Sequence, residues 1–344
     1  MIEERKKLIL TQEMEEDAII SLSLRPQKID EFIGQKEVVE GLKLALHAAR
    51  QRGEPIEHIL FSGPPGLGKT SLAHIVAHEM NAKITITSGP SITRAGDLIG
   101  ILTNLERGDI LFIDEIHRLS KPVEEFLYPA MESYQIDFIV DKGPYARTIK
   151  FNLKPFTLIG ATTRSGLLAS PLRDRFGIYY HLEFYEPFEL SQIVLNSSQK
   201  LNVIIDQESA LAIARRSRGT PRIANRLLRR VRDFAQVKAG SNKITASLVD
   251  SSMAVLGIDH EGLDEADRRF LRVISEHYKG GPVGVETLAA TLNEEVDTLI
   301  DVIEPFLLKS GFLKRTSRGR ELSEVGLKHI GAAFVKEGIA KDLF

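Results

Sequence analysis

The stretch GPPGLGKT at residues 63–70 constrains the fold of this chain more than any other feature. It follows the apolar, β-rich run HILFSG (58–63), and the next residues, SLAHIVAHEM (71–80), carry apolar side chains at helical spacing. A strand, a glycine-rich loop and a helix in that order form a phosphate-binding loop. The pattern therefore predicts an α/β fold that holds a nucleotide at this loop.

Each residue type in the loop has a physical role there. Gly63, Gly66 and Gly68 let the backbone curl so that successive N–H groups point at phosphate oxygens. The start of the following helix adds partial positive charge. Lys69 is placed to reach the β- and γ-phosphates, and the hydroxyl of Thr70 to ligate Mg²⁺. We expect ATP and Mg²⁺ as the ligands.

Short β-rich runs alternate with helical patterns from about residue 20 to residue 185. Near-continuous apolar runs of this kind predict a mainly parallel sheet with helices on both faces. We expect a large ATPase domain at 1–185, with an N-terminal extension at 1–20, a small helical domain at 186–257 and a third domain at 258–344. The runs are HILFSG (58–63), KITITS (83–88), DILFID (109–114) and FTLIGATT (156–163).

Two further strands end in polar side chains. The run ILFIDEIH (110–117) delivers Asp114 to the tip of a buried strand, where it can bind Mg²⁺ through water. Glu115 can then polarise the water that attacks the γ-phosphate. The run LIGATTR (158–164) ends in hydroxyl groups, and Thr163 could hydrogen-bond the attacking water or the γ-phosphate.

Arginines gather in two segments. In SPLRDRFG (170–177), Asp174 either bridges two arginines on an exposed turn, or one arginine is a finger that supplies charge to the transition state of phosphoryl transfer. Residues 215–232 contain eight arginines and no acid. A Gly-Thr-Pro turn would place Arg222 in the first turn of a helix, where it could face a nucleotide. The other arginines fit a solvated or interdomain face, and a direct contact with DNA stays open.

The spacing of residues 265–330 predicts three helices followed by a hairpin, which is a winged-helix pattern. Residues 281–304 contain six acids and no Lys or Arg, whereas residues 305–320 contain five bases and no acid. A helix rich in carboxylates approaches a phosphate backbone unfavourably, so the basic wing is the expected DNA contact. Backbone contact is expected rather than base reading. The candidates are Arg315, Arg318 and Arg320.

Composition narrows the class of protein. The absence of cysteine excludes disulfides, thiolate catalysis and cysteine-ligated metals, and favours a reducing cytoplasm. No apolar run approaches the roughly 20 residues that a membrane span requires, and residues 1–20 lack the pattern of a secretory signal. Lys and Arg number 45 against 47 Asp and Glu, so any electrostatic partner site must be local.

Together these motifs resemble the AAA+ ATPase family. The residues of these motifs are most similar to those of the bacterial AAA+ motors that drive branch migration of Holliday junctions. The resemblance runs from LSLRP (22–26) to the C-terminal RTSRGR (315–320), and its motifs are GPPGLGKT, DEIHRL, GATTR, SPLRDRFG and GTPRIANRLLRRVRDFA. It implies an ATP hydrolase that translocates duplex DNA in recombination and repair.

The resemblance also implies roles for individual residues around ATP. Leu24 and Arg25 would pack against the adenine, and Gly66, Lys69, Thr70 and Ser71 would bind the phosphates. Asp114 and Glu115 would form the catalytic acidic pair, Thr163 and Arg222 the first and second sensors, and Arg175 the arginine finger. Four further residues would lie near the nucleotide: Glu132, Ser133, Tyr134 and Tyr185.

Partners follow from the resemblance as well. The alternating segments YQIDFIV (134–140) and ARTIKFNL (146–153) flank DKGPY and predict a β-hairpin. In the family, this hairpin (135–153) docks onto the junction-binding protein RuvA, and the resolvase RuvC acts indirectly. Family members form a homohexameric ring around DNA, in which Arg175 would act on the ATP of a neighbour. No membrane partner is expected.

Two other functions compete with a DNA motor. A protein-unfolding ring is disfavoured because residues 81–108 contain no Phe, Tyr or Trp to form an aromatic pore loop. A clamp-loader or replication-initiator type of ATP switch suits the winged helix, and the catalytic motifs do not separate it from a motor. A metal role for His74 and His78 lacks an evident third ligand. His117, in DEIH, is expected to make a local hydrogen bond.

Overall fold

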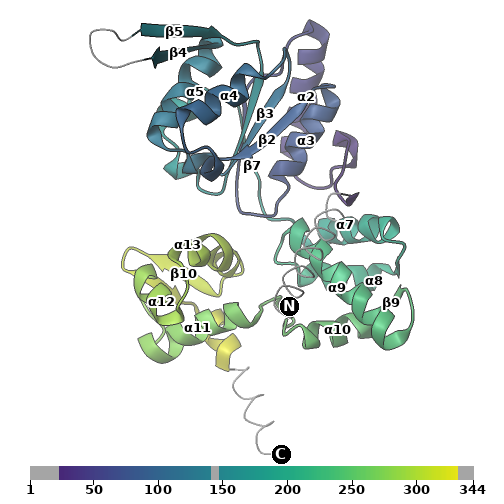
Figure 1. Ribbon diagram of the computed structural model, residues 1–344. Coiled ribbons are helices and arrows are strands. Elements are labelled where there is room, and N and C mark those ends of the chain that lie inside the picture. The colour runs from purple at the N-terminus through teal and green to yellow at the C-terminus, as the bar shows by residue number, and fades with distance from the viewer. Residues whose placement is uncertain (1–22, 141–146, 332–344) are drawn as a thin grey trace, which may run out of the picture. The chain divides into compact units, whose positions relative to one another are not determined.

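The computed structural model of the 344-residue chain describes residues 23–140 and 147–331. The chain divides into two compact units, Met1–Phe184 and Tyr185–Phe344, each described below by itself (Figure 1). The first holds a β-sheet, and the second holds a small helical domain followed by a winged helix. Among the described helices, none has the length and apolar character needed to cross a membrane.

The first unit is built on a parallel five-stranded sheet in the order β2-β3-β6-β1-β7. The prediction of a mainly parallel sheet is confirmed, and the four predicted runs are four of its strands. The fifth, β7, was not predicted; it pairs with β1 in the register Ile59↔Ile178. The strands are β1 (Ile59–Ser62), β2 (Ile84–Ser88), β3 (Ile110–Asp114), β6 (Thr157–Thr162) and β7 (Ile178–His181).

Helices cover both faces of this sheet, with α4 and α5 on one side and α2 and α3 on the other (Figure 1). Alternate side chains of a strand serve the two faces: Leu111 and Ile113 join the cluster under α4 and α5. Phe112 and Phe61 are also fully buried. The helices are α2 (Lys36–Arg52), α3 (Lys69–Glu79), α4 (Ala95–Thr103), α5 (Lys121–Ser133) and α6 (Ser170–Arg173), with 3-10 turns at Ile29–Glu31, Gly89–Ser91, Ile116–Arg118 and Ser165–Leu167.

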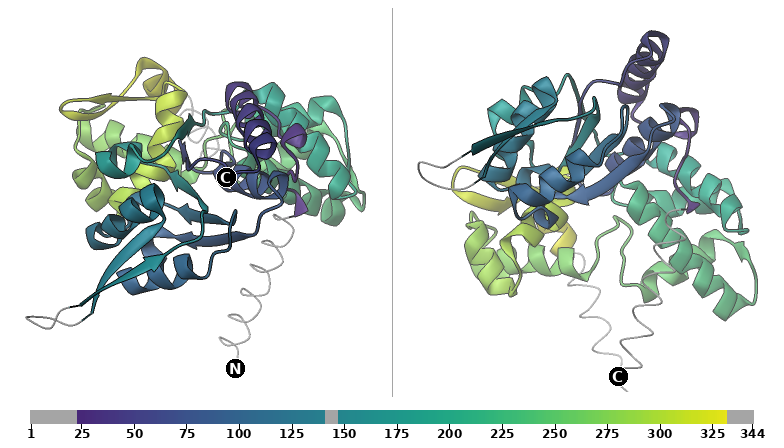
Figure 2. Two further views of the ribbon diagram at one scale, coloured as in Figure 1. Left: turned by 90° about the horizontal axis from the view of Figure 1, so that it is seen from above. Right: turned by 45° about the horizontal axis from the view of Figure 1, so that its top comes forward.

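A separate antiparallel hairpin follows α5. It consists of β4 (Gln135–Val140) and β5 (Arg147–Asn152), paired from Gln135↔Asn152 to Val140↔Arg147. The predicted hairpin is therefore confirmed, although its DKGPY turn lies outside the described residues. Both views of Figure 2 show the two strands projecting away from the body of their unit.

The second unit begins with a small helical domain. Its helices start at capping side chains: Asp206 accepts a hydrogen bond from the N–H of Ser209, and Thr220 from that of Ile223. The helices are α7 (Pro187–Lys200), α8 (Gln207–Arg215), α9 (Pro221–Ala239) and α10 (Ala246–Val255); the two-residue strands β8 (Ile204–Ile205) and β9 (Lys243–Ile244) pair in parallel.

The winged-helix prediction is confirmed with one difference. The third predicted helix is broken into three pieces, because a π-helical turn separates two short α-helices. Phe270, Leu288 and Leu307 pack in the domain's core. The elements are α11 (Glu265–Tyr278), α12 (Val285–Leu292), α13 (Val296–Thr298), the π-turn η6 (Leu299–Ile303), α14 (Glu304–Lys309), β10 (Leu313–Thr316) and β11 (Gly319–Leu322).

Candidate active site

The phosphate loop leaves the end of β1 and turns into α3. Gly63, Gly66 and Gly68 have φ angles of +126°, +83° and +108°, which side chains with a Cβ rarely adopt. A Cβ on Gly63 would also lie 2.3 Å from the carbonyl oxygen of Leu182, in the segment after β7. The glycine is therefore required both by conformation and by close packing.

Lys69 is the first residue of α3, and only 7% of it is exposed. Its Nζ donates to the carbonyl oxygens of Gly63, at 2.6 Å, and Pro64, at 2.9 Å. The ammonium group thus lies against the loop, beside the positive end of the α3 dipole. Thr70 and Ser71 follow in the first turn of α3, with their side chains partly exposed. This arrangement concentrates positive charge and N–H donors where phosphates would bind.

The acidic pair lies at the end of β3. Oδ1 of Asp114 accepts a hydrogen bond from the N–H of Glu115 at 3.0 Å, and Glu115 has a left-handed backbone, with φ +48°. Because β3 and β6 are parallel neighbours, their last residues meet at one edge of the sheet. Oε2 of Glu115 accepts from Oγ1 of Thr163 at 3.2 Å and from its N–H at 3.4 Å.

His117 adds a further polar contact at this edge. Its Nδ1 lies 2.8 Å from Oγ1 of Thr162 and 3.2 Å from Oε2 of Glu115. The side chain is almost fully buried, at 6% exposure. The expected local hydrogen bond is confirmed: its partner is Thr162, and the carboxylate of Glu115 lies close to the same ring nitrogen. In the sequence, only the position of His117, two residues after Glu115, suggests that the two side chains lie close together.

The segment that begins at residue 23 approaches the same part of the unit. Leu24 is buried. Burial lowers the pKa of His74 on α3, and the charge of Arg25 lowers it further, so Arg25 lies near the helix behind the phosphate loop. The side chain of Gln35 exchanges hydrogen bonds with the backbone of Glu183, at 2.6 and 3.1 Å, just beyond the end of β7.

A different group of predicted residues lies at the opposite edge of the sheet. Arg175 precedes β7; it donates to Oε2 of Glu132 at 3.1 Å and to the carbonyl oxygen of Pro171 at 2.7 Å. Its guanidinium carbon lies 4.7 Å from the centre of the Tyr128 ring, a cation–π distance. Among the described residues, the buried Nε of Arg175 has no hydrogen-bond partner.

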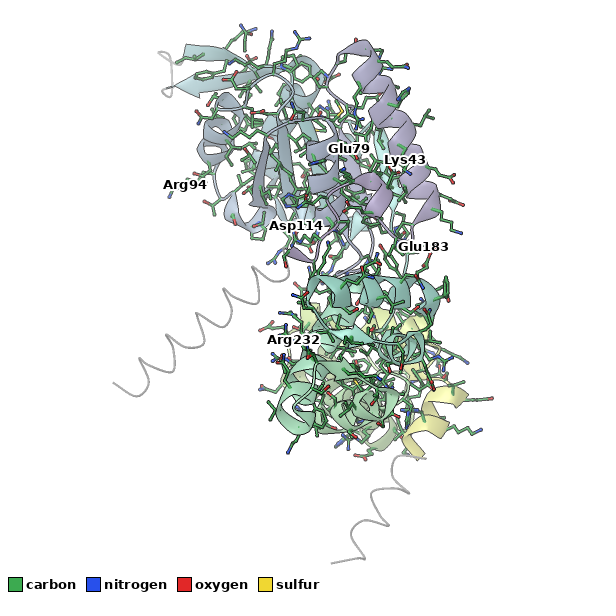
Figure 3. All side chains as sticks on the ribbon, turned by 90° about the vertical axis from the view of Figure 1, so that its right-hand side faces the viewer. Lys43, Glu79, Arg94, Asp114, Glu183 and Arg232 are labelled. Atoms are coloured by element: carbon green, nitrogen blue, oxygen red, sulfur yellow. The ribbon has the colours of Figure 1, made fainter. Side chains whose placement is uncertain are left out.

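Tyr134 fixes the position of this second group. Its ring packs against His58 and Phe156, which directly precede β1 and β6. The strand β1 has four residues and so separates the two edges by about 13 Å. Figure 3 accordingly shows Asp114 at the opposite end of its unit from the hairpin that follows α5. The structure therefore does not bring Glu132, Ser133, Tyr134 or Arg175 to the phosphate loop of their own chain.

The remaining nucleotide candidates belong to the second unit. Arg222 is the second residue of α9, and its side chain is exposed. Tyr185 is buried, at 2% exposure, and its N–H donates to the carbonyl oxygen of Gly219 at 2.9 Å. Tyr185 and Arg222 are thus connected through the loop that precedes α9.

The wing keeps only part of its predicted DNA face. Arg315 and Arg318 are exposed, as is Lys314. Arg320, in contrast, is 7% exposed and forms a two-pronged ion pair with buried Glu304, at 2.6 and 3.1 Å. Its backbone is bonded to Val283 on one side and lies opposite Arg315 on the other. The prediction that Arg320 contacts DNA is therefore corrected: its charge is neutralised inside the domain.

The burial of Glu304 likewise changes the balance of exposed charge on this domain. It was counted among the six acids that oppose DNA, but it is 1% exposed and paired with Arg320. The acidic face of this domain is therefore smaller by one carboxylate, and the basic wing by one arginine. The contrast between acidic helices and a basic wing remains, carried by exposed residues such as Glu294, Glu295 and Arg315.

Comparisons with known proteins cover both units. Residues 24–182 match the family described as the Holliday junction DNA helicase RuvB P-loop domain. Residues 185–259 match the RuvB AAA lid domain, and residues 260–331 the RuvB C-terminal winged-helix domain.

Individual relatives agree with these matches. The chain is 55% identical over 320 residues, 93% of each chain, to the Holliday junction branch migration complex subunit RuvB of Desulfosudis oleivorans. It is 57% identical to the same subunit of Paramagnetospirillum magneticum, covering 90% of this chain and 89% of that one. The solved RuvB branch migration motor of Thermotoga maritima aligns with a TM-score of 0.84 at 53% identity, over 90% of this chain and 98% of that chain. The chain therefore belongs to the RuvB family of AAA+ P-loop ATPases.

Proposed function

We propose that this chain is an ATP-driven motor that moves duplex DNA and so drives branch migration of Holliday junctions in recombination and repair. The observation that carries the proposal is the pairing of a complete phosphate loop and acidic pair in the first unit with a basic wing in the second. Membership of the RuvB family favours this motor over a clamp-loader or initiator type of switch. We place the motor in the cytoplasm, the compartment that the cysteine-free sequence favours.

In this proposal, ATP binds at the edge where the strands of the sheet end. Lys69, Thr70, Ser71 and the loop N–H groups hold the phosphates. Glu115 orients the attacking water, and Thr163 holds Glu115 and senses the γ-phosphate. Leu24 and Arg25 pack against the adenine, Tyr185 lies near the nucleotide, and Arg222 acts as the second sensor.

The same edge suits Mg²⁺. A carboxylate, Asp114, and a hydroxyl, Thr70, are the oxygen donors this ion prefers, and Mg²⁺ is usually held by one or two carboxylates together with substrate phosphates. The described residues offer no cluster of three or more His, Cys, Asp or Glu that could hold a metal without the nucleotide. When bound, the ion would neutralise charge on the phosphates.

Arg175 is proposed to act on the ATP of a neighbouring subunit. It lies with Glu132 at the edge where the strands begin, about one strand length from Lys69 of the same chain. An arginine finger must touch the transferred phosphoryl group. Glu132, Ser133 and Tyr134 would then belong to the same subunit interface. A closed, homohexameric ring satisfies every subunit in turn.

The β4–β5 hairpin is the proposed docking site for RuvA, through which the resolvase RuvC would be reached indirectly. A two-stranded ribbon that stands apart from the main sheet is marginally stable alone, so a partner's surface would complete it. Ile149, on β5, is exposed there.

Arg315 and Arg318 are the proposed DNA contacts, together with Lys314. Reversing the charge of Arg315 and Arg318 should lower the salt slope of DNA binding by about two, because each phosphate contact contributes about 0.9. Arg320→Met is the matched control. It should leave the salt slope unchanged but destabilise the domain by about 3–5 kcal/mol, since Glu304 would remain buried without its partner.

The decisive test is ATP-dependent branch migration of a synthetic four-way junction, with and without RuvA. The proposal predicts migration that requires hydrolysis and increases with RuvA. Sustained, DNA-stimulated turnover supports a motor. A single hydrolysis event per DNA-loading cycle, without migration, would support a switch instead.

A further inference from the structure

Arg218 of the small helical domain is inserted into the winged-helix domain. It lies in the loop 216–220 between α8 and α9, is 8% exposed and has a left-handed backbone, with φ +54°. Its NH2 donates to Oδ1 of Asp267 at 3.0 Å and to the carbonyl oxygen of Val302 at 3.2 Å. Its NH1 lies 3.4 Å from Oδ2 of Asp264, and its guanidinium carbon 5.0 Å from the centre of the Phe306 ring.

These partners are themselves structural points of the winged helix. Asp264 caps α11 by accepting from the N–H groups of Ala266 and Asp267, at 2.9 and 3.1 Å. Oδ2 of Asp267 accepts in return from the N–H of Asp264 at 3.0 Å, which completes a capping box. Val302 belongs to the π-turn, a kind of element often found at functional sites. Arg218 therefore grips the start of α11 and the π-turn together.

The linker between the two domains passes against the same loop. Arg216 donates to Oδ1 of Asp250 at 2.7 Å, and its NH2 lies 2.9 Å from Nδ1 of His260 in the linker. Gly262 has φ +84°, and a Cβ there would lie 2.9 Å from the carbonyl oxygen of Arg216. The joint between the domains is thus packed on both sides of Arg218.

The other end of the loop leads to the proposed nucleotide residues. The carbonyl oxygen of Gly219 accepts from the N–H of Tyr185, and Thr220 caps α9 two residues before Arg222. Ser217 is fully buried, and its carbonyl oxygen accepts from the N–H of Thr220 at 3.0 Å. With so many internal hydrogen bonds, the loop has little freedom to absorb a displacement.

We infer that Arg218 is a positioning residue that couples the DNA-contacting domain to the nucleotide site, because it clamps the winged helix onto the loop that sets Tyr185 and Arg222. This inference rests on the proposed function. Force on the wing would reach α9 through Arg218, and a change at the nucleotide would reach the wing by the same contacts. Such coupling is reciprocal and typically amounts to a factor of about 5–150 in affinity between sites.

The ionisation of Asp267 should make the effect of losing Arg218 depend on pH, which the loss of packing alone would not do. Burial raises its pKa to about 7, against the lowering effect of Arg218, while the charge of Asp264 raises it further; these are the charged groups that act on it in the described structure. The pKa of Asp267 in the folded protein lies above its ordinary value of 3.8. The contribution of Asp267 to the free energy of unfolding is therefore fully present below pH 3.8 and is lost as the pH rises to about 7. Arg218 limits that loss.

The test uses the full chain, with duplex DNA as the probe and ATP turnover as the readout. Arg218→Met keeps the length of the side chain but removes its charge. We expect it to keep unstimulated hydrolysis within about twofold and to lose DNA stimulation by about fivefold or more. Arg218→Lys keeps the charge but not the forked guanidinium group, so its DNA stimulation should lie between that of the wild type and that of Arg218→Met. Arg230→Met removes an exposed arginine on α9, the helix that follows this loop, and should behave as the wild type.

Thermal unfolding supplies a second readout. The gap in unfolding temperature between wild type and Arg218→Met should widen from pH 5.5 to pH 8.5, because unpaired Asp267 is costly only when ionised. An equal gap at both pH values contradicts the inference, as does normal DNA stimulation in Arg218→Met. If the wild type shows no DNA stimulation, the proposed function fails and the inference falls with it; a stimulated wild type with an unaffected variant overturns the inference alone.

Discussion

The two edges of the five-stranded sheet are built in different ways. Where the strands end, backbone geometry dominates: left-handed glycines, the start of α3, and short side chains such as Asp114 and Thr163 at the strand tips. Where the strands begin, long side chains dominate, with Arg175 lying over Tyr128 and paired with Glu132. The first edge gathers N–H groups and the ammonium group of Lys69, whereas the second holds a partly exposed, paired guanidinium.

In the proposed ring, this difference would give each chain two halves of different active sites, with the phosphate loop at one edge and the finger at the other. A phosphate loop without a nearby arginine finger has only part of the charge that phosphoryl transfer requires. An arginine held by one carboxylate and an aromatic ring, with about 13 Å of strand between it and its own loop, has no phosphate to act on in its own chain. The proposed ring would let neighbouring copies complete each other's sites.

The largest effects on ATP hydrolysis are expected from one arginine and one lysine at opposite edges of the sheet, and their effects on ATP binding should differ. Arg175→Ala and Lys69→Ala should each lower ATP hydrolysis by about 10³-fold or more. Only Lys69→Ala should also weaken ATP binding, because only Lys69 lies in the phosphate loop of its own chain. Turnover and binding of a fluorescent ATP analogue measure the two effects. If Arg175→Ala hydrolyses ATP normally, the assignment of the finger is wrong.

The two carboxylates provide the next comparison. Glu115→Gln should reduce turnover by about 10²–10⁴-fold while ATP still binds, because the base that orients water is lost. Glu132→Gln, at the other edge, changes a charge that holds Arg175 and should cost less than about tenfold. Single-turnover hydrolysis measures both. Equal losses for the two variants would contradict the division of roles.

A smaller effect is expected at His117. His117→Ala and Thr162→Val each remove one partner of the hydrogen bond between these two side chains, which holds the ring of His117 beside the charged carboxylate of Glu115. Each should lower kcat about tenfold with little change in KM, since a bond to a charged group contributes about 1.5–3 kcal/mol. The double variant should be no worse than either single one. Additive losses would show that the two residues act separately.

The smallest effect is expected from the aromatic support of Arg175. Tyr128→Leu removes the ring under the guanidinium, a contact of about 0.5–1 kcal/mol when partly exposed. Turnover should fall about threefold at unchanged ATP affinity. A loss as large as that of Arg175→Ala would mean that Tyr128 itself belongs to the reacting centre.

Sequence patterns locate the side chains of the first edge but not the contacts of the second, for a physical reason. Asp114 and Thr163 follow apolar runs, and the end of a buried strand fixes where the next side chain lies. The contacts of Arg175 come from a helix more than 40 residues earlier in the sequence, and no local pattern records them. Arg320 was misplaced for the same reason: its charge is cancelled by Glu304, sixteen residues away, across the domain.

Other features depended on weak local signals. The strand β7 was not predicted because its short run alternates between partly buried and exposed residues. The break in the third helix of the winged domain was not predicted, although Pro305 follows the π-turn by two residues and lacks the N–H that a continuous helix would use. Arg218 was seen only as one of eight arginines between 215 and 232, and its burial depends on acids almost 50 residues away.

Mixing two inactive variants tests the central claim most directly. Equal amounts of Lys69→Ala and Arg175→Ala subunits would form about one quarter of their interfaces from an intact phosphate loop and an intact finger, half of one times half of the other. Our account predicts that the mixture regains DNA-stimulated ATP hydrolysis that neither variant shows alone. A mixture as inactive as its components, under conditions in which mixed assemblies are shown to form, would contradict a shared active site.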